Sequence, residues 1–249
     1  MKKRTEAIVL SGREFKEADL IVTFLTKDYG LLELFAKSPR KVGSRFGSSL
    51  EPLTYSRIAF IGKEQANLPR LIQSDIIRPF QSLRESYRAF VVLSEAVELT
   101  KRILPKNLPQ RGPFQLLLNL LMAVEAGKDL RKQLIYYKIK LLKLSGFAPG
   151  LQHCVRCGAE TSRFYLDQGA LLCPDCHGDE STSLVIENRI RGLYNYLLKI
   201  RPSVLDRLRI EDDVLTGLER VINSHINYNI IDKRLNTHEF MLSLRQLEG

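Results

Sequence analysis

The 249-residue sequence has no long apolar run. No stretch approaches the 18 or so apolar residues that a membrane-spanning helix needs. The apolar run behind the basic N-terminus, residues 7–10, is too short for a secretory signal peptide. With 44% hydrophobic and 27% charged residues, the composition is ordinary for a globular protein. We therefore expect a cytoplasmic protein that does not contact a membrane.

Motifs for common enzyme chemistry are also missing. The sequence contains neither a GxxxxGK[ST] loop nor a GxGxxG fingerprint, so it has no recognisable motif for binding and hydrolysing a nucleotide. No His-x-Glu precedes a CxxC pair, which excludes the signature of the zinc-dependent deaminases. No Ser–His–Asp set can be defended either. These absences predict that the chain is not an enzyme.

Cysteine is scarce, and its four occurrences form two CxxC pairs separated by 15 residues. In a cytoplasmic protein this spacing favours metal binding over disulfides, because each CxxC turn aims two thiolates at one ion. Four thiolates close a tetrahedral shell, so we expect one structural Zn²⁺ ion. A catalytic zinc that keeps a water ligand is the alternative. The predicted ligands are Cys154, Cys157, Cys173 and Cys176.

Acidic residues are too few to balance the basic ones, and the formal net charge is +10. Counting side chains along the sequence gives +5 for residues 1–80 and +7 for residues 81–150. The cysteine segment, residues 151–180, carries −3, and a zinc ion with four thiolates adds −2. An anionic partner is therefore expected on the first 150 residues and not on the cysteine segment.

The apolar pattern has a period of two up to residue 80 and a period near 3.6 after it. Five short strands are predicted, at residues 5–10, 20–26, 31–37, 53–61 and 68–77. Helices are predicted from residue 81 to about 104 and at 113–126, 129–145, 187–200, 213–231 and 238–247. Five strands suit a small closed barrel, with an oligonucleotide-binding (OB) fold as first choice and an SH3-like barrel as the alternative. We thus expect an α+β, multi-domain chain: an OB domain at 1–80 and a helical domain at 81–249, which carries an inserted zinc module at 151–180.

A basic loop is predicted between the third and fourth strands. It carries four cations, and no acidic residue occurs from residue 35 to residue 50. Such a loop can follow a phosphate backbone, although a solvated charge cluster is the alternative. Phe46, which lies among the cations, either stacks on a base or packs in the core. The predicted DNA-binding residues are Lys37, Arg40, Lys41 and Arg45.

A second group of cations lies in the predicted helices. Those of the third predicted helix do not form one stripe, so several are expected only to solubilise it. A basic rim beside an apolar helical groove would nevertheless suit an acidic peptide with an aromatic tip. The group comprises Lys101, Arg102, Lys106, Arg111, Lys128, Arg131, Lys132, Lys138, Lys140 and Lys143.

The predicted order of barrel, helices, cysteine module and helices extends over essentially the whole chain, and within it four stretches of sequence form a combined pattern. They are Glu17-Ala18-Asp19 with Thr26-Lys27-Asp28-Tyr29-Gly30; Ala36-Lys37-Ser38-Pro39-Arg40 with Ser44-Arg45-Phe46-Gly47 and Leu50-Glu51-Pro52; Leu141-Leu142 with Gly146-Phe147-Ala148-Pro149 ahead of the first CxxC; and Phe164 with Gly169-Ala170-Leu171-Leu172 ahead of the second CxxC. Together they resemble the RecO family of bacterial recombination mediators. The sequence departs from that family at Ser38, where the family tends to have Gly, and at Gly169-Ala170, where it tends to have Gly-Gly.

The resemblance implies an OB domain followed by a helical domain with the zinc module. It implies a protein of the bacterial cytoplasm, associated with the nucleoid, that binds single- and double-stranded DNA and anneals complementary strands. It also implies partnership with RecR and with the acidic tail of single-stranded DNA-binding protein (SSB), and help in loading RecA at gaps. The DNA positions that it carries over are Lys37, Arg40 and Arg45. Two other hypotheses remain: a zinc-dependent enzyme acting on nucleic acid, and a pure adaptor for acidic protein tails.

Overall fold

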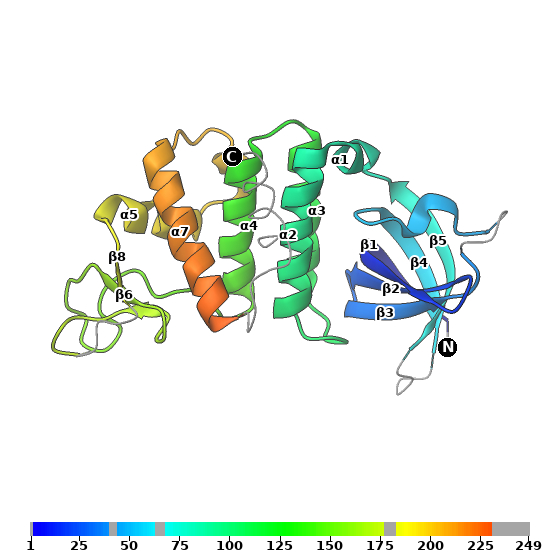
Figure 1. Ribbon diagram of the computed structural model, residues 1–249, viewed down its shortest axis with the longest axis horizontal. Coiled ribbons are helices and arrows are strands. Elements are labelled where there is room, and N and C mark those ends of the chain that lie inside the picture. Colours follow the sequence, from blue (N-terminus) through cyan, green and yellow to red (C-terminus); the bar gives the residue numbers. More distant parts are fainter. Residues whose placement is uncertain (1, 40–43, 63–67, 177–182, 231–249) are drawn as a thin grey trace. The chain divides into compact units, whose positions relative to one another are not determined.

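The computed structural model describes residues 2–39, 44–62, 68–176 and 183–230. Contacts between residues divide the chain into two compact units, Met1–Gly127 and Lys128–Gly249. The described part of the first unit contains a five-stranded barrel, three α-helices and the short 3-10 helix η1 (Gly47–Leu50) (Figure 1). The boundary at residue 80 between an OB domain and a helical domain remains a prediction.

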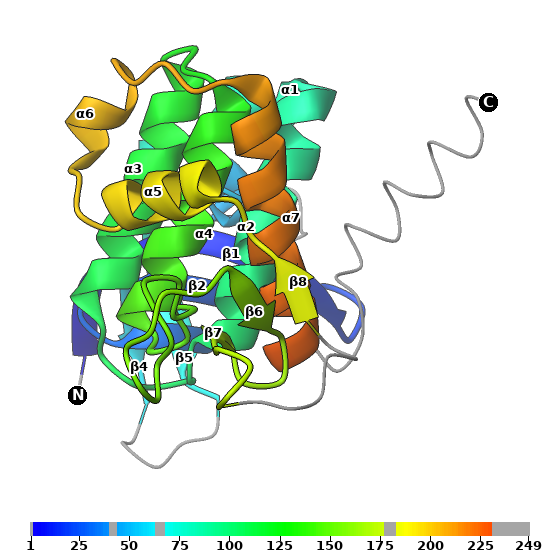
Figure 2. The ribbon, with the colours of Figure 1, turned by 90° about the vertical axis from the view of Figure 1, so that its left-hand side faces the viewer.

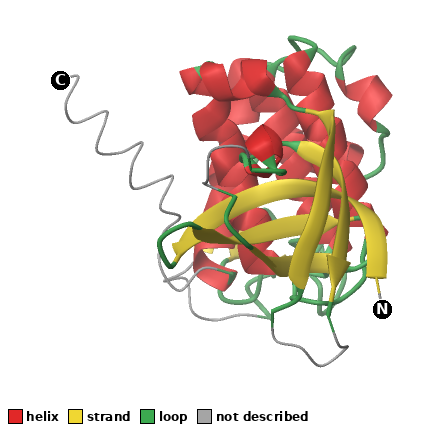
Figure 3. Ribbon diagram, turned by 90° about the vertical axis from the view of Figure 1, so that its right-hand side faces the viewer, coloured by secondary structure: helices red, strands yellow, loops and turns green. Residues whose placement is uncertain are grey.

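The five N-terminal strands close into a barrel in the order β1-β2-β3-β5-β4. All neighbouring pairs are antiparallel except β3 and β5, which pair in parallel through Phe35 and Arg70. Figure 3 shows the strands crossing one another as they curve into this barrel. Strand number, order and closure confirm the predicted OB-like fold. The strands are β1 (Lys2–Phe15), β2 (Asp19–Thr26), β3 (Gly30–Ala36), β4 (Tyr55–Ile61) and β5 (Arg70–Arg78).

Alternate residues of the strands fill the barrel. Val9, Phe24 and Leu34 belong to the buried inner cluster, together with residues of β4 and β5. The register of β1 against β2 shifts between Val9 and Ser11, which is the signature of a β-bulge. Because a bulge bends a strand, it lets the long β1 pair with β2 along one part and with β4 along the other.

Helices cover one part of the outside of the barrel. The first unit contains α1 (Gln81–Glu85), α2 (Tyr87–Ile103) and α3 (Arg111–Glu125), and α3 packs on β1 and β2. Ile8 and Leu25 are paired across these strands and are fully buried, although neither belongs to the inner cluster. The apolar sequence of α3 correctly predicted a buried helix, since it supplies the outer layer over these residues.

The second unit contains four helices in its described part: α4 (Leu130–Leu144), α5 (Asn188–Leu197), α6 (Pro202–Leu205) and α7 (Asp212–Asn229). Asp129 caps α4 as predicted, since its side chain accepts from the Lys132 N–H at 2.9 Å. Gly146 has φ +78 just after α4, as its C-terminal position requires. The helix predicted at 238–247 lies outside the described residues. Among those described, no helix is long and apolar enough to cross a membrane.

A small three-stranded sheet accompanies the cysteines. Its order is β7-β6-β8, and the strands are β6 (Arg163–Tyr165), β7 (Ala170–Leu171) and β8 (Ser183–Val185). It lies below α5 in Figure 1 and in Figure 2. These strands could not be predicted from the sequence, because two or three residues are too few to show a period.

Candidate metal centre and candidate nucleic-acid surface

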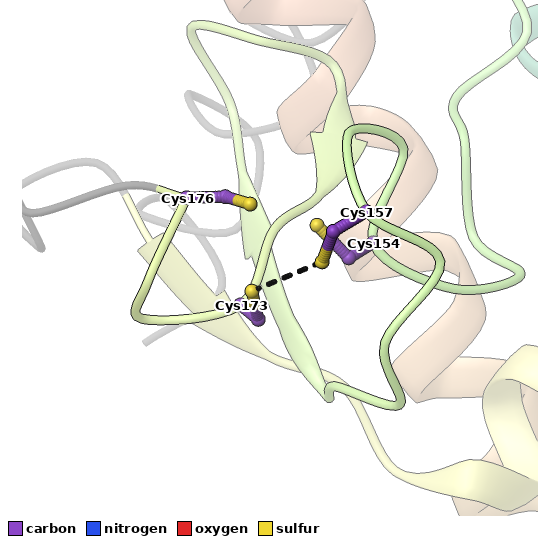
Figure 4. Close-up of side chains that lie close together, drawn as sticks. All are labelled: Cys154, Cys157, Cys173 and Cys176. Carbon is purple, nitrogen blue, oxygen red and sulfur yellow. Dashed lines mark hydrogen bonds between the residues drawn. The ribbon is translucent and has the colours of Figure 1, made fainter.

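The four cysteines converge on one point. Their sulfur atoms all lie within 4.8 Å of one another, and the Cys157 and Cys173 sulfurs are 3.5 Å apart (Figure 4). A tetrahedral zinc with Zn–S bonds of about 2.3 Å requires sulfur–sulfur edges of about 3.8 Å. The cluster therefore has the dimensions of a four-thiolate metal site.

Each CxxC forms a tight turn that holds its sulfurs in place. The Gly158 N–H donates to the Cys154 carbonyl at 2.9 Å, and the Cys176 N–H donates to the Cys173 carbonyl at 3.0 Å. Gly158 has φ +80, in the left-handed region that glycine adopts without strain. The turn behind the first pair thus explains why glycine follows Cys157.

Ionisation of the thiols is uneven. Burial opposes ionisation of Cys154, but hydrogen bonds from the Cys157, Cys173 and Arg156 backbone outweigh it and lower the pKa of Cys154 to about 6. Side-chain hydrogen bonds with Cys157 and Cys173 that favour its protonated form raise the pKa of Cys176 to about 12. Four clustered thiols that share hydrogen-bonding protons are suited to exchange these protons for a divalent cation.

These four side chains can hold a metal ion such as zinc. They are the only group of three or more possible His, Cys, Asp or Glu ligands among the residues that the structure describes. Four sulfurs leave no open position for water, which a catalytic zinc would need. The arrangement therefore favours a structural role.

Contacts anchor the cysteine module to the helices of the second unit. The Tyr194 hydroxyl of α5 donates to the Pro149 carbonyl at 2.9 Å, just ahead of the first CxxC. Gly169, which has φ +59, lies against the His225 ring of α7, where even a Cβ would be 3.0 Å from that ring. His225 is buried, which lowers the pKa of its imidazole, and its Nε2 lies 2.8 Å from the Phe147 carbonyl oxygen. His225 therefore packs against the cysteine module and is hydrogen-bonded to the segment that leads into it.

Two of the four predicted DNA-binding residues lie in the described part of the basic loop. Lys37 and Arg45 are exposed, while Arg40 and Lys41 lie outside the described residues. Ser38 has φ +53, and its N–H donates to the Asp19 carboxylate at 2.7 Å. Ser38, which stands where the resembling family tends to have Gly, therefore keeps the left-handed backbone conformation that glycine favours.

Phe46 does not present its ring for stacking on a base. It is only 3% exposed and belongs to the inner cluster of the barrel. The Arg45 guanidinium lies over this ring, 4.9 Å from its centroid. Of the two interpretations that the sequence left open, packing in the core is the one that the structure supports.

The strand register exposes two further cations that the sequence analysis missed. Arg13 of β1 pairs with Ile21 of β2, and Arg70 of β5 pairs with Phe35 of β3. Both arginines are exposed, and neither forms an ion pair with an acidic residue of the described part of the chain. Their signal in the sequence is only an outward position in an alternating strand, which cannot be recognised until the bulge and the register are known.

The cations of the basic helical surface are paired with other residues of their own unit. Each of its ten cations has a hydrogen-bonding or ion-pair partner in its own unit. Arg131 of α4, for example, binds Glu219 of α7 through two nitrogens, the shorter contact being 2.7 Å. Lys140 donates to the Leu198 carbonyl at 3.0 Å, near the end of α5. These cations of α4 hold the helices of the second unit together, so they do not form a free basic rim.

Comparison with known proteins gives a consistent result over both units. A family model described as "Recombination protein O N terminal" matches residues 1–80, and one described as "Recombination protein O C terminal" matches residues 84–238. The chain is 42% identical to the DNA repair protein RecO of Thermodesulfovibrio yellowstonii over 232 residues, 91% of this chain and 92% of that protein. It is 30% identical to the DNA repair protein RecO of Dehalococcoides mccartyi strain CBDB1 over 246 residues, 97% and 96% of the two chains.

Proposed function

This chain belongs to the RecO family of DNA repair proteins, and from this premise we propose that it is a recombination mediator without catalytic activity. In this proposal it binds single- and double-stranded DNA and anneals complementary strands at the bacterial nucleoid. It works with RecR and with the acidic tail of SSB, and so helps RecA to load onto SSB-coated DNA. The partners rest on the family resemblance, since the ten helical cations do not mark out a free peptide site.

The DNA-binding part of the proposal rests on exposed cations of the barrel that have no acidic partner among the described residues. They are Arg13, Lys37, Arg45 and Arg70. Two complementary strands repel each other as polyanions. Cations that neutralise phosphates release the counterions condensed on each strand, which favours binding and lets the strands approach. Annealing by this route needs no bond to be made or broken, so it needs no catalytic residue.

We further propose that the four cysteines hold one structural Zn²⁺ ion. The support is the size of the sulfur cluster, the four soft donors and the two turns that position them. The module contributes only a small apolar cluster of its own, formed by Tyr165 and Leu172 with the buried cysteines. A segment of this size usually depends on a metal to stay folded.

An annealing assay with complementary oligonucleotides tests the proposal. The intact protein is added to the strands with and without SSB, over a series of salt concentrations. We expect annealing to accelerate in both cases and to weaken as salt rises, because the binding is electrostatic. A protein that binds an SSB-tail peptide but leaves oligonucleotides unbound even in dilute buffer would be an adaptor, and the proposal would be wrong.

A further inference from the structure

Two phenylalanines form an aromatic pair on the outside of the barrel. Phe15 is the last residue of β1, and 37% of it is exposed. Its ring meets the half-buried ring of Phe35 on β3 edge to face, with centroids 5.9 Å apart and an interplanar angle of 85°. A phenylalanine side chain that is left this open costs hydrophobic free energy, so a ligand that covers it would gain that free energy back.

Strand pairing places Phe35 within a row of residues that crosses four strands. Arg13 pairs with Ile21, Ile21 pairs with Phe35, and Phe35 pairs with Arg70. Residues that face one another across paired strands point to the same side of the sheet. The neighbouring residues Val22 and Leu34 belong to the inner cluster, so this row faces outward. Phe35 therefore lies between two exposed arginines.

Two lysines complete the surroundings. Lys16 follows Phe15, and its Nζ lies 5.7 Å from the centroid of the Phe15 ring. Lys37 follows Phe35 by two residues and is exposed. Neither lysine forms an ion pair with an acidic residue in the described part of the chain. Among nearby carboxylates, that of Asp19 accepts the Ser38 N–H at 2.7 Å, and those of Glu14 and Glu17 are exposed.

We propose that Phe15 and Phe35 form a stacking platform for an unpaired base of a single-stranded nucleic acid, with Arg13, Lys37 and Arg70 contacting its phosphates. This inference rests on the proposed function and deepens it. The faces of all nucleobases stack on aromatic rings, and cations on either side of the rings suit the backbone that links successive bases. A base in a duplex is stacked within its own strand and cannot reach the platform. The platform therefore favours single strands, whereas cations alone bind both forms.

The cations around the two rings favour a single-stranded nucleic acid over an apolar protein segment as the ligand. Four cations around a two-ring patch would be costly to desolvate under an apolar partner. A polyanion with flat apolar faces satisfies both the rings and the cations. Phe46, the other phenylalanine that lies among cations, cannot serve the same role because its ring is buried in the barrel.

Fluorescence anisotropy with the full-length chain tests this inference. The variants are Phe15→Leu and Phe35→Leu, which keep an apolar side chain, and the control is Tyr87→Leu, which removes an exposed aromatic ring elsewhere in the first unit. Each is titrated with a single-stranded oligonucleotide, with an abasic strand of equal length and with a duplex. Thermal unfolding checks that all variants are folded.

We expect each phenylalanine variant to bind the single strand about tenfold more weakly, which is the loss of one stacked base. Affinity for the abasic strand and for the duplex, and the salt dependence of all three, should not change. Phe35→Leu repeats the test if Phe15→Leu does not fold. Equal losses on base-containing and abasic strands, no loss on any strand, or an equal loss with Tyr87→Leu would overturn the platform while leaving electrostatic DNA binding intact. A wild-type chain that binds no nucleic acid would overturn the proposed function and this inference together.

Discussion

Replacing two exposed cations of the basic loop should weaken DNA binding without weakening the fold. In the double variant Lys37→Ala/Arg45→Ala, neither lost side chain has an ion-pair partner among the described residues. The exposed Arg45 guanidinium lies over the buried Phe46 ring, and losing this contact should cost about 0.5–1 kcal/mol. The free energy of unfolding should therefore stay within about 1 kcal/mol of the wild-type value.

The expected loss of affinity follows from counterion release. Each phosphate contact contributes about 0.7 to the slope of log affinity against log salt on single strands. Losing two contacts should make the slope less steep by about 1.4 and, at about 0.1 M salt, should lower affinity by roughly 25-fold. That factor corresponds to about 1.9 kcal/mol of binding free energy.

A double variant with the same change of charge is the control. Lys106→Ala/Arg102→Ala also removes two cations, but Lys106 is paired with Glu33 at 3.0 Å and Arg102 with Glu98 at 2.9 Å. Fluorescence anisotropy with one oligonucleotide over a salt series gives the slope for each protein. If both double variants flatten the slope equally, net charge is responsible and the loop is not. If the loop variant keeps the wild-type slope, Lys37 and Arg45 do not contact phosphates.

Three further predictions concern the scaffold. Cys157→Ser should lower the amount of bound zinc and increase hydrogen exchange in residues 151–176, and full zinc retention would contradict a four-thiolate site. DNA binding by this variant should fall only in proportion to the loss of folded protein. Gly30→Ala should lower the free energy of unfolding, measured in urea, by about 3 kcal/mol or more, because Gly30 has φ +69 and a Cβ there would overlap the carbonyl of Leu108. Gly47→Ala is the control: Gly47 has φ +48 but open space around it, so this change should cost only about 1–2 kcal/mol. Equal losses in the two variants would show that the overlap at Gly30 relaxes freely. Hydrogen bonds from the Tyr55 hydroxyl and from Lys27 lower the pKa of Glu6, so ionised Glu6 stabilises the fold above its unfolded-state pKa of about 4.3. This contribution disappears as pH falls through the lower pKa of the folded state. The difference in unfolding free energy between wild type and Glu6→Gln should therefore shrink over that pH range, and a constant difference would contradict the prediction.

Local patterns were sufficient to predict most of the fold. The change of period near residue 80 predicted the five strands and the helices α3, α4, α5 and α7, because the side-chain period of an element is a property of consecutive residues. The one helix predicted from residue 81 to about 104 is divided into α1 and α2, the short α6 was missed, and the helix predicted at 238–247 stays a prediction. The two CxxC pairs predicted a cluster of four sulfurs that can hold a metal ion, since each turn positions its own two sulfurs. The small strands of the cysteine module were missed because they are too short to show a period.

Local sequence patterns could not predict which charged side chains are paired and which aromatic rings are exposed. Arg131 and Glu219 are 88 positions apart in sequence, so only the packing of α4 on α7 shows that this cation is already used inside the protein. Phe15 and Phe46 are both single phenylalanines beside cations, yet one ring is partly exposed and the other is buried. Their difference depends on the bulge in β1 and on the closure of the barrel. Exposure is a property of the assembled surface, and no window of neighbouring residues contains the contacts that decide it.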